Sequence, residues 1–191
     1  MDFSFLSAVG KLKTQLRSGW LFYLPDSAHH ETVAGHSFRV GIMAMFSQNG
    51  LNKEKCIKMA LVHDLCEAFC GDLVLEEWLS PEQRLFFKKI GKSVKSRTDE
   101  HKLEFESLKL VLGTQNDSNL KEIQELWLEY EDQQTPESKF IKELDKLEML
   151  VQAKEYEMSH PKLDLTEFFT TAIPEVTNKS LIPILEKIRP T

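Results

Sequence analysis

Three side chains with acid–base or metal-binding chemistry lie close together in the most apolar stretch of the chain. His63, Asp64 and Glu67 fall within residues 58–72, where most other positions are apolar. Burying imidazole and carboxylate groups there is unfavourable unless they are paired or bound to a metal ion. On one continuous helix, His63 lies about 40° from Glu67, and Asp64 lies about 60° from it on the other side. The pattern predicts that the three groups converge; the alternative is a paired core histidine beside a surface aspartate.

Two residues elsewhere in the chain have suitable chemistry to join such a site. His36 begins a helix whose apolar stripe continues through Val40 and Met43, although a histidine on such a stripe is usually a core residue. Asp145 lies about 100° from the centre of the inward stripe of its predicted helix. Periodicity therefore places Asp145 at the rim of the buried face, where a carboxylate is more often solvated.

Helical periodicity recurs along the chain, whereas alternating strand patterns are few, which indicates an all-α protein. Ser80-Pro81 and Thr135-Pro136 are strong helix starts, since each joins a capping side chain to proline at the first helical position. A loop is expected around Gly19 and Pro25, and Asn49-Gly50 should end a helix. The predicted helices cover about 5–16, 34–48, 53–69, 80–112 with a break near Gly91, 119–131 and 135–158, followed by short segments at 165–171 and 180–188.

Composition excludes several classes of protein. The 191 residues carry 24 Lys and Arg against 30 Asp and Glu, and the net charge of −6 argues against a broad nucleic-acid surface. No run of about 18 apolar residues could span a membrane, and the N-terminus lacks the pattern of a signal peptide. Cys56, Cys66 and Cys70 form an odd set that is expected to be reduced. We therefore expect one soluble, cytoplasmic domain.

The order of these groups resembles the HD-domain metal-dependent phosphohydrolases, and most closely their 5′-deoxynucleotidase branch. The likeness covers about residues 16–157 and implies an all-α HD-domain helical bundle. It implies a single domain over 1–191, with C-terminal helices at 164–190 packing on the bundle. The similar blocks are Arg17-Ser18-Gly19-Trp20, Glu31 to Ser37, Lys58 to Asp72, Leu126 to Glu131 and Lys139 to Lys146.

The resemblance implies that one divalent metal ion is held by His36, His63, Asp64 and Asp145. Such a mixed nitrogen and oxygen site suits Mn²⁺, Co²⁺, Fe²⁺ or Zn²⁺. The implied reaction is hydrolysis of (deoxy)nucleoside 5′-monophosphates to nucleoside and phosphate. Glu67 is then the catalytic residue that deprotonates or orients water, or protonates the leaving oxygen.

The same resemblance assigns the substrate contacts. Arg17 is expected to clamp the phosphate, because its guanidinium fork matches phosphate oxygens. Trp20 either packs on the sugar or base or is an ordinary core residue. Asp72 is expected to be both a catalytic and a substrate-binding residue that contacts a sugar hydroxyl; the alternative is that it caps the backbone of its turn. Glu31 and Arg39 are either supports for the metal-binding residues or a surface salt bridge.

The sequence also departs from the family pattern. Gly35 stands where an acidic residue usually precedes the histidine, so one contact that supports the metal-binding residues is expected to be missing. Cys66 and Cys70, four residues apart, could form a thiolate metal site with His63, although buried cysteine commonly serves as a hydrophobic residue.

Alternative functions are a different phosphoester hydrolysis, an iron oxygenase reaction on the same scaffold, or non-catalytic binding. A di-iron oxygenase would need further ligands for a second metal, and no extra histidine is evident near His63. His101 is distant in the sequence, and His29-His30 lie in a loop of uncertain placement. The resemblance further implies a homodimer, a nucleotide substrate, and no nucleic-acid polymer or membrane as partner.

Overall fold

The computed structural model describes residues 2–46, 50–92, 94–113 and 117–189, and most of them are helical. The prediction of an all-α protein is therefore confirmed. A short parallel pair of strands was not predicted. Its two-residue strands are too short to produce an alternating pattern in the sequence.

Packing divides the chain into two compact units that alternate along the sequence. The first unit comprises Met1–Gly35 and Asp64–Gln124, and the second comprises His36–His63 and Glu125–Thr191. Each unit is described separately below. The assignment of 1–191 to a single domain remains a prediction.

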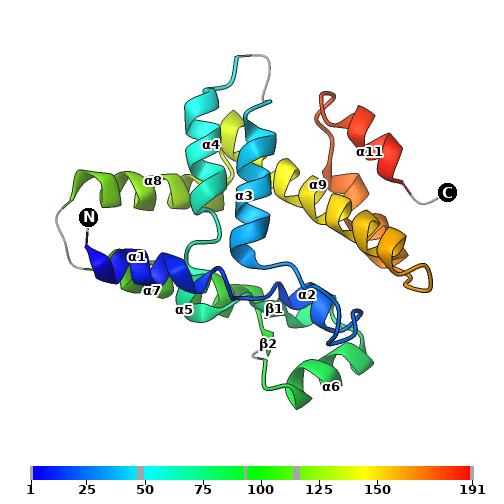
Figure 1. Cartoon of the computed structure of the whole chain (residues 1–191). Helices are drawn as coiled ribbons and strands as arrows, with labels where there is room; N and C mark the ends of the chain where they lie inside the picture. Colours follow the sequence, from blue (N-terminus) through cyan, green and yellow to red (C-terminus); the bar gives the residue numbers. More distant parts are fainter. Residues whose placement is uncertain (1, 47–49, 93, 114–116, 190–191) are drawn as a thin grey trace. The chain divides into compact units, whose positions relative to one another are not determined.

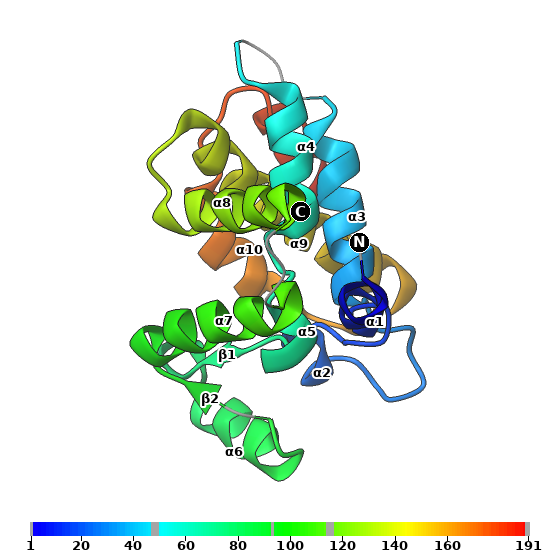
Figure 2. The same ribbon diagram turned by 90° about the vertical axis from the view of Figure 1, so that its left-hand side faces the viewer.

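The first unit is built around packing between α5 and α7, with α1 against both (Figure 2). Leu108 and Val111 of α7 and Ala8 of α1 are among its buried apolar residues. Its elements are α1 (Phe3–Lys11), α2 (Ser18–Leu21), α5 (Glu67–Cys70), β1 (Val74–Leu75), a 3₁₀ turn (Glu76–Trp78), α6 (Pro81–Lys89), β2 (Val94–Lys95) and α7 (Arg97–Leu112), together with the first residues of α3 and of α8.

The second unit is organised by α9, which is 24 residues long and packs against α4, α10 and α11 (Figure 1). Phe140, Leu144, Leu147 and Val151 are the predicted inward stripe of α9; the first three are buried and Val151 is half-buried. The elements are α3 (Val33–Ala44), α4 (Lys53–Val62), α8 (Ser118–Asp132), α9 (Pro136–Ser159), α10 (Thr166–Ala172), a 3₁₀ turn (Ile173–Glu175) and α11 (Ile182–Ile188).

The capping signals mark real helix starts. The Thr135 side chain accepts a hydrogen bond from Ser138 N at 3.1 Å at the start of α9. Ser80 and Gln83 form a capping box at the start of α6, which explains why this helix begins at Pro81. The expected break at Gly91 is also present, since its φ of +74° suits a glycine that ends a helix.

The predicted helix over 53–69 is wrong in one important respect. It is interrupted, because α4 ends at Val62 and α5 begins only at Glu67. At the break, His63 Nδ1 lies 2.8 Å from Ala60 O, the carbonyl that would accept from the backbone N–H of Asp64 in a continuous helix. The side chain of His63 therefore competes with the helix backbone, so the angular argument from a single helix does not apply to Asp64 and Glu67.

Other boundaries shift for local reasons. The first helix ends at Lys11 rather than near residue 16, because Leu16 pairs with Thr32 as an antiparallel bridge. The short helix α2 lies inside the predicted loop. The predicted helix end at Gln48 and the Asn49 cap lie outside the described residues. Among the helices that are described, none combines the length and apolar character needed to cross a membrane.

Candidate functional site

Three predicted metal ligands converge inside the second unit. His36 comes from α3, His63 follows the end of α4, and Asp145 lies on α9. His36 Nε2 is 3.2 Å from His63 Nε2 and 3.1 Å from Asp145 Oδ1. We call these three residues the acceptor triad, for the reason given next.

The partners of the two histidines decide which ring nitrogen carries the proton. His63 Nδ1 faces the Ala60 carbonyl oxygen, which can only accept, so Nδ1 donates and the neutral ring keeps a lone pair on Nε2. His36 Nδ1 faces the carboxylate of Glu148, which also accepts a hydrogen bond from the guanidinium of Arg39. Nδ1 of His36 therefore donates as well. Two imidazole lone pairs and one carboxylate oxygen thus face one another.

This donor set fits a divalent cation. Neutral imidazole nitrogens and a carboxylate oxygen bind such ions at about 2.0–2.2 Å. Ligand atoms on one ion at those distances lie roughly 2.8–3.6 Å apart in octahedral or tetrahedral geometry, and the two separations from His36 Nε2 are 3.2 and 3.1 Å. The alternative is an extra proton on one histidine. The acceptor triad therefore requires added positive charge.

Asp145 is held more firmly than the rim position suggested by its periodicity. Its side chain is only 13% exposed, and Tyr130 Oη donates to Oδ2 at 3.0 Å. Burial alone raises the pKa of the Asp145 carboxyl. Without a metal ion, the alternative state applies, in which a histidine carries the extra proton. The hydrogen bond from His36 and the positive charges of Lys142, His36 and His63 then outweigh burial and hold the pKa of Asp145 well below its usual range. Asp145 is accordingly an anion facing the two histidines.

Sequence reasoning missed two residues that support the acceptor triad, Glu148 and Tyr130. Glu148 is fully buried on α9, and Tyr130 also packs edge-on against the His63 ring, with centroids 5.1 Å apart. One sequence feature could have pointed to Glu148. It is a charged residue that directly follows Leu147, a member of the apolar stripe of this helix. Gly35 was expected to leave one supporting contact of the metal-binding residues missing. His36 nevertheless has a carboxylate partner, which is Glu148 on α9.

In the first unit, Arg17 and three carboxylates form a second cluster, composed of Asp64, Glu67 and Asp72. Arg17 Nη1 lies 3.2 Å from Asp64 Oδ2. The Asp72 carboxylate accepts from Ser18 N, and Ser18 Oγ donates to Asp72 O at 2.7 Å. Asp72 therefore caps the start of α2, directly after Arg17, rather than its own turn. We refer to these four residues as the carboxylate cluster.

Glu67 is the most unusual member of the carboxylate cluster. Its side chain is buried, and Oε2 has no hydrogen-bond partner within the described part of the chain. Burial raises the pKa of Glu67 well above its usual value, and the charges of Asp64 and Asp72 raise it further against the opposing charge of Arg17. An unsatisfied buried carboxyl group is rare and is typical of functional sites.

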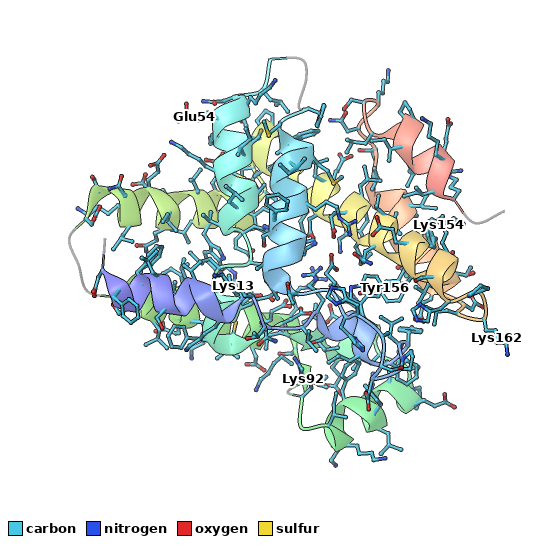
Figure 3. All side chains as sticks on the ribbon, in the orientation of Figure 1. Lys13, Glu54, Lys92, Lys154, Tyr156 and Lys162 are labelled. Carbon is cyan, nitrogen blue, oxygen red and sulfur yellow. The ribbon has the colours of Figure 1, made fainter. Side chains whose placement is uncertain are left out.

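Burial also raises the pKa of Asp72, although Arg17, the backbone N–H of Ser18 and Lys92 oppose that rise. Lys92 is labelled in Figure 3. Two neighbouring carboxyl groups, Glu67 and Asp72, thus favour the protonated form more strongly than free carboxyl groups do. The carboxylate cluster therefore has the capacity to hold a proton.

Trp20 and Glu31 form a buried pair in the first unit. Trp20 is 2% exposed, and its Nε1 donates to Glu31 Oε2 at 2.9 Å. Glu31 O in turn accepts from Arg17 N at 3.0 Å. These contacts favour a core role for Trp20 in holding the Arg17 segment. Arg39 pairs with Glu148 and Glu155 on α9.

The cysteines are all free thiols. Cys70 Sγ donates to Cys66 O at 3.3 Å, an ordinary contact along one helix. The hydrogen bond with Cys70, together with burial, raises the pKa of the Cys66 thiol well above its usual value. A thiolate ligand needs the opposite shift, so the contacts of Cys66 favour packing for that residue. The hydrogen bond with Cys66 lowers the pKa of the Cys70 thiol.

Comparison with known proteins shows the family of this chain. The HD-domain family matches residues 9–188. The chain is 35% identical over 186 residues to the zebrafish (Danio rerio) protein named 5′-deoxynucleotidase HDDC2, covering 96% of this chain and 84% of the relative. It is 36% identical over 170 residues to the Schizosaccharomyces pombe 5′-deoxynucleotidase hdd1, covering 86% of this chain and 77% of the relative.

Solved structures show the same fold. A conserved hypothetical protein from Pyrococcus furiosus matches with a TM-score of 0.70 and 30% identity, covering 98% of this chain and 99% of the other. A Pyrococcus horikoshii protein also has a TM-score of 0.70, at 29% identity and 98% coverage of each chain. The chain belongs to the HD-domain family, as the motif order predicted.

The buried state of Glu67 generates a prediction about stability and pH in metal-free protein. Because folding raises the pKa of Glu67, the folded state binds its proton more tightly, and the free energy of unfolding falls as pH rises above the ordinary value of 4.5. Glu67→Gln removes this titration. We expect the variant to gain stability relative to the wild type as pH rises above about 4.5 in urea denaturation with a chelator present.

Glu186→Gln is the matched control, since Glu186 is exposed on α11. Its stability curve should run parallel to that of the wild type. Parallel curves for Glu67→Gln and the wild type would contradict the assigned state of Glu67.

Proposed function

We propose that this protein is a divalent-metal-dependent 5′-nucleotidase that hydrolyses (deoxy)nucleoside 5′-monophosphates to nucleoside and phosphate. The observation that carries the proposal is the acceptor triad, whose two imidazole lone pairs and one carboxylate need a cation. The relatives named 5′-deoxynucleotidases supply the substrate class. The net charge of −6 supports a nucleotide substrate rather than a nucleic-acid polymer.

The proposed metal ligands are His36, His63, Asp64 and Asp145. Asp64 is included because the family resemblance implies it and because it follows His63 directly in the chain. Nitrogen and oxygen donors suit Mn²⁺, Co²⁺, Fe²⁺ or Zn²⁺. The bound cation would supply positive charge that lowers the pKa of a water molecule and offsets the charge of the phosphate.

Glu67 is proposed to handle the proton of the hydrolysis, either by taking it from water or by giving it to the leaving oxygen. Its partnerless oxygen leaves a hydrogen-bonding position for water or substrate. Asp72 is proposed to assist at the sugar end of the substrate. Because Oδ2 accepts from Ser18 N, Oδ1 is the oxygen proposed for this contact.

Arg17 is proposed to bind the phosphate. Its guanidinium is only 16% exposed, and Asp64 Oδ2 neutralises part of its charge at 3.2 Å. Trp20 is proposed to support substrate binding by holding Glu31, whose carbonyl group fixes the backbone of Arg17. In this proposal Trp20 acts on substrate binding through Glu31 and Arg17, and not by touching the substrate itself.

The central prediction concerns phosphate release. Chelator-treated protein given Mn²⁺, Co²⁺, Fe²⁺ or Zn²⁺ should release phosphate from deoxynucleoside 5′-monophosphates. Glu67→Gln should lower kcat by about 100-fold or more, because general acid–base catalysis is worth that much. Glu186→Gln should keep the wild-type rate. Absence of metal-dependent release from every 5′-monophosphate tested would overturn the proposed function and favour a different HD-domain reaction or a binding protein.

A separate prediction addresses the phosphate clamp. Arg17→Lys keeps the charge but loses the bidentate fork, so KM for the nucleotide should rise roughly tenfold or more, since a hydrogen bond to a charged group is worth about 1.5–3 kcal/mol. The change in kcat should be smaller. Arg189→Lys, at an exposed position after α11, is the matched control. An unchanged KM in Arg17→Lys would remove Arg17 from the phosphate site.

We further propose a cytoplasmic location and a homodimer. The three free thiols suit a reducing compartment. A homodimer is implied by the family resemblance, and the second unit exposes an apolar row four residues apart along and just after α3, formed by Phe38, Ile42 and Phe46. A second copy of the chain is the proposed occupant of that row.

Sedimentation equilibrium tests the homodimer. The wild type should sediment as a dimer at micromolar concentration, and Phe46→Ser should shift it towards monomer. Phe3→Ser removes a similarly exposed ring on α1 and should leave the dimer intact. A wild-type monomer, or a dimer insensitive to Phe46→Ser, would rule out this interface.

A further inference from the structure

Arg39 and Glu148 form a chain of contacts that starts at the half-buried Arg39 and ends on the buried His36. Glu148 Oε1 accepts from Arg39 Nε at 2.7 Å, while Oε2 accepts from His36 Nδ1. Arg39 also donates to Glu155 Oε2 at 2.7 Å and to Gln152 Oε1 at 2.5 Å. One guanidinium on α3 therefore holds three side chains of α9, and only one of the three touches the acceptor triad.

We propose that Glu148, held by Arg39, is a positioning residue that fixes His36 as a metal ligand. The inference rests on the proposed function, because it needs His36 to bind the metal. Glu148 itself acts through the imidazole ring and contributes no ligand atom.

The burial of Glu148 argues for a demanding role. Its side chain is fully buried, and a buried carboxylate is expensive unless both oxygens are satisfied. Here each oxygen has its own partner, Arg39 on one side and His36 on the other. The arrangement removes the freedom of Glu148 to rotate, so the acceptor for His36 Nδ1 stays in one place.

A fixed acceptor has two consequences for His36. The proton is kept on Nδ1, so the lone pair stays on Nε2, which faces His63 and Asp145. The hydrogen bond to a carboxylate also makes the imidazole a stronger ligand and prevents ring rotation. Removing such a supporting partner typically weakens metal affinity 10- to 100-fold.

Glu148→Gln is the sharpest variant. The amide keeps the size of the side chain but has one acceptor oxygen and one donor nitrogen, so it cannot accept from both Arg39 and His36. Glu155→Gln is the matched control, because Glu155 binds the same guanidinium at the same distance of 2.7 Å but is 53% exposed and lies at the far end of the contact chain.

The experiment is titration calorimetry of the full chain with Mn²⁺ after chelator treatment. We expect the Kd of Glu148→Gln to rise about 10- to 100-fold, with Glu155→Gln within about threefold of wild type. Nitrogen-15 NMR of the histidine rings gives a second readout that needs no metal. It should show His36 protonated on Nδ1 in the wild type, with the Nε2-protonated form appearing in Glu148→Gln.

His36→Ala separates the two levels of the proposal. If the wild type binds no metal, or His36→Ala binds as the wild type does, the proposed function fails at this ligand. If His36→Ala loses affinity while a folded Glu148→Gln binds normally and keeps the Nδ1 form, only the positioning role is overturned.

Should Glu148→Gln not fold, Arg39→Lys tests the same positioning role. It loses the fork that holds Glu148 and is expected to weaken Mn²⁺ binding by a smaller factor, whereas unchanged binding overturns the role.

Discussion

Two imidazole lone pairs and a carboxylate oxygen face one another in the interior of the second unit, and they are stable together only when positive charge lies among them. This follows from the partners on their outer sides. The Ala60 carbonyl and the Glu148 carboxylate can only accept, so each histidine uses its Nδ1 proton there and turns a bare Nε2 inward. Asp145 adds an anion, held by Tyr130 and Lys142.

Each unit has a further group of polar contacts. In the second unit, Arg39 and Glu148 hold the ring of His36. In the first unit, the carboxylate cluster places Arg17, the proposed phosphate ligand, beside Asp64. The cost of these arrangements is visible in the local structure. The helix that carries His63 stops at Val62, and Glu67 keeps a buried oxygen without a partner. Both features lower local stability at residues that are proposed to take part in catalysis or metal binding, as is common in enzymes.

Much of the fold could be predicted because the start of a helix depends on a few neighbouring residues in the sequence. Thr135-Pro136 and Ser80-Pro81 predict α9 and α6, since capping depends on residues a few positions apart. The break after Val62 could not be predicted, because it depends on whether the His63 side chain or the backbone N–H of Asp64 donates to the Ala60 carbonyl. Likewise, Asp145 looked like a rim residue on its own helix, and only its partners from other elements, His36 and Tyr130, hold it inside. The family resemblance predicts the metal ligands, whereas the contact of Glu148 with His36 can be found only from the packing of α3 against α9.

Anomalous diffraction from crystals grown with Mn²⁺ tests the central claim most directly. The account predicts one strong anomalous peak within coordination distance of His36 Nε2, His63 Nε2 and Asp145 Oδ1. It also predicts that the peak disappears in crystals of His36→Ala. Ordered metal elsewhere in the molecule with none at these three atoms, or a peak that survives His36→Ala, would contradict it.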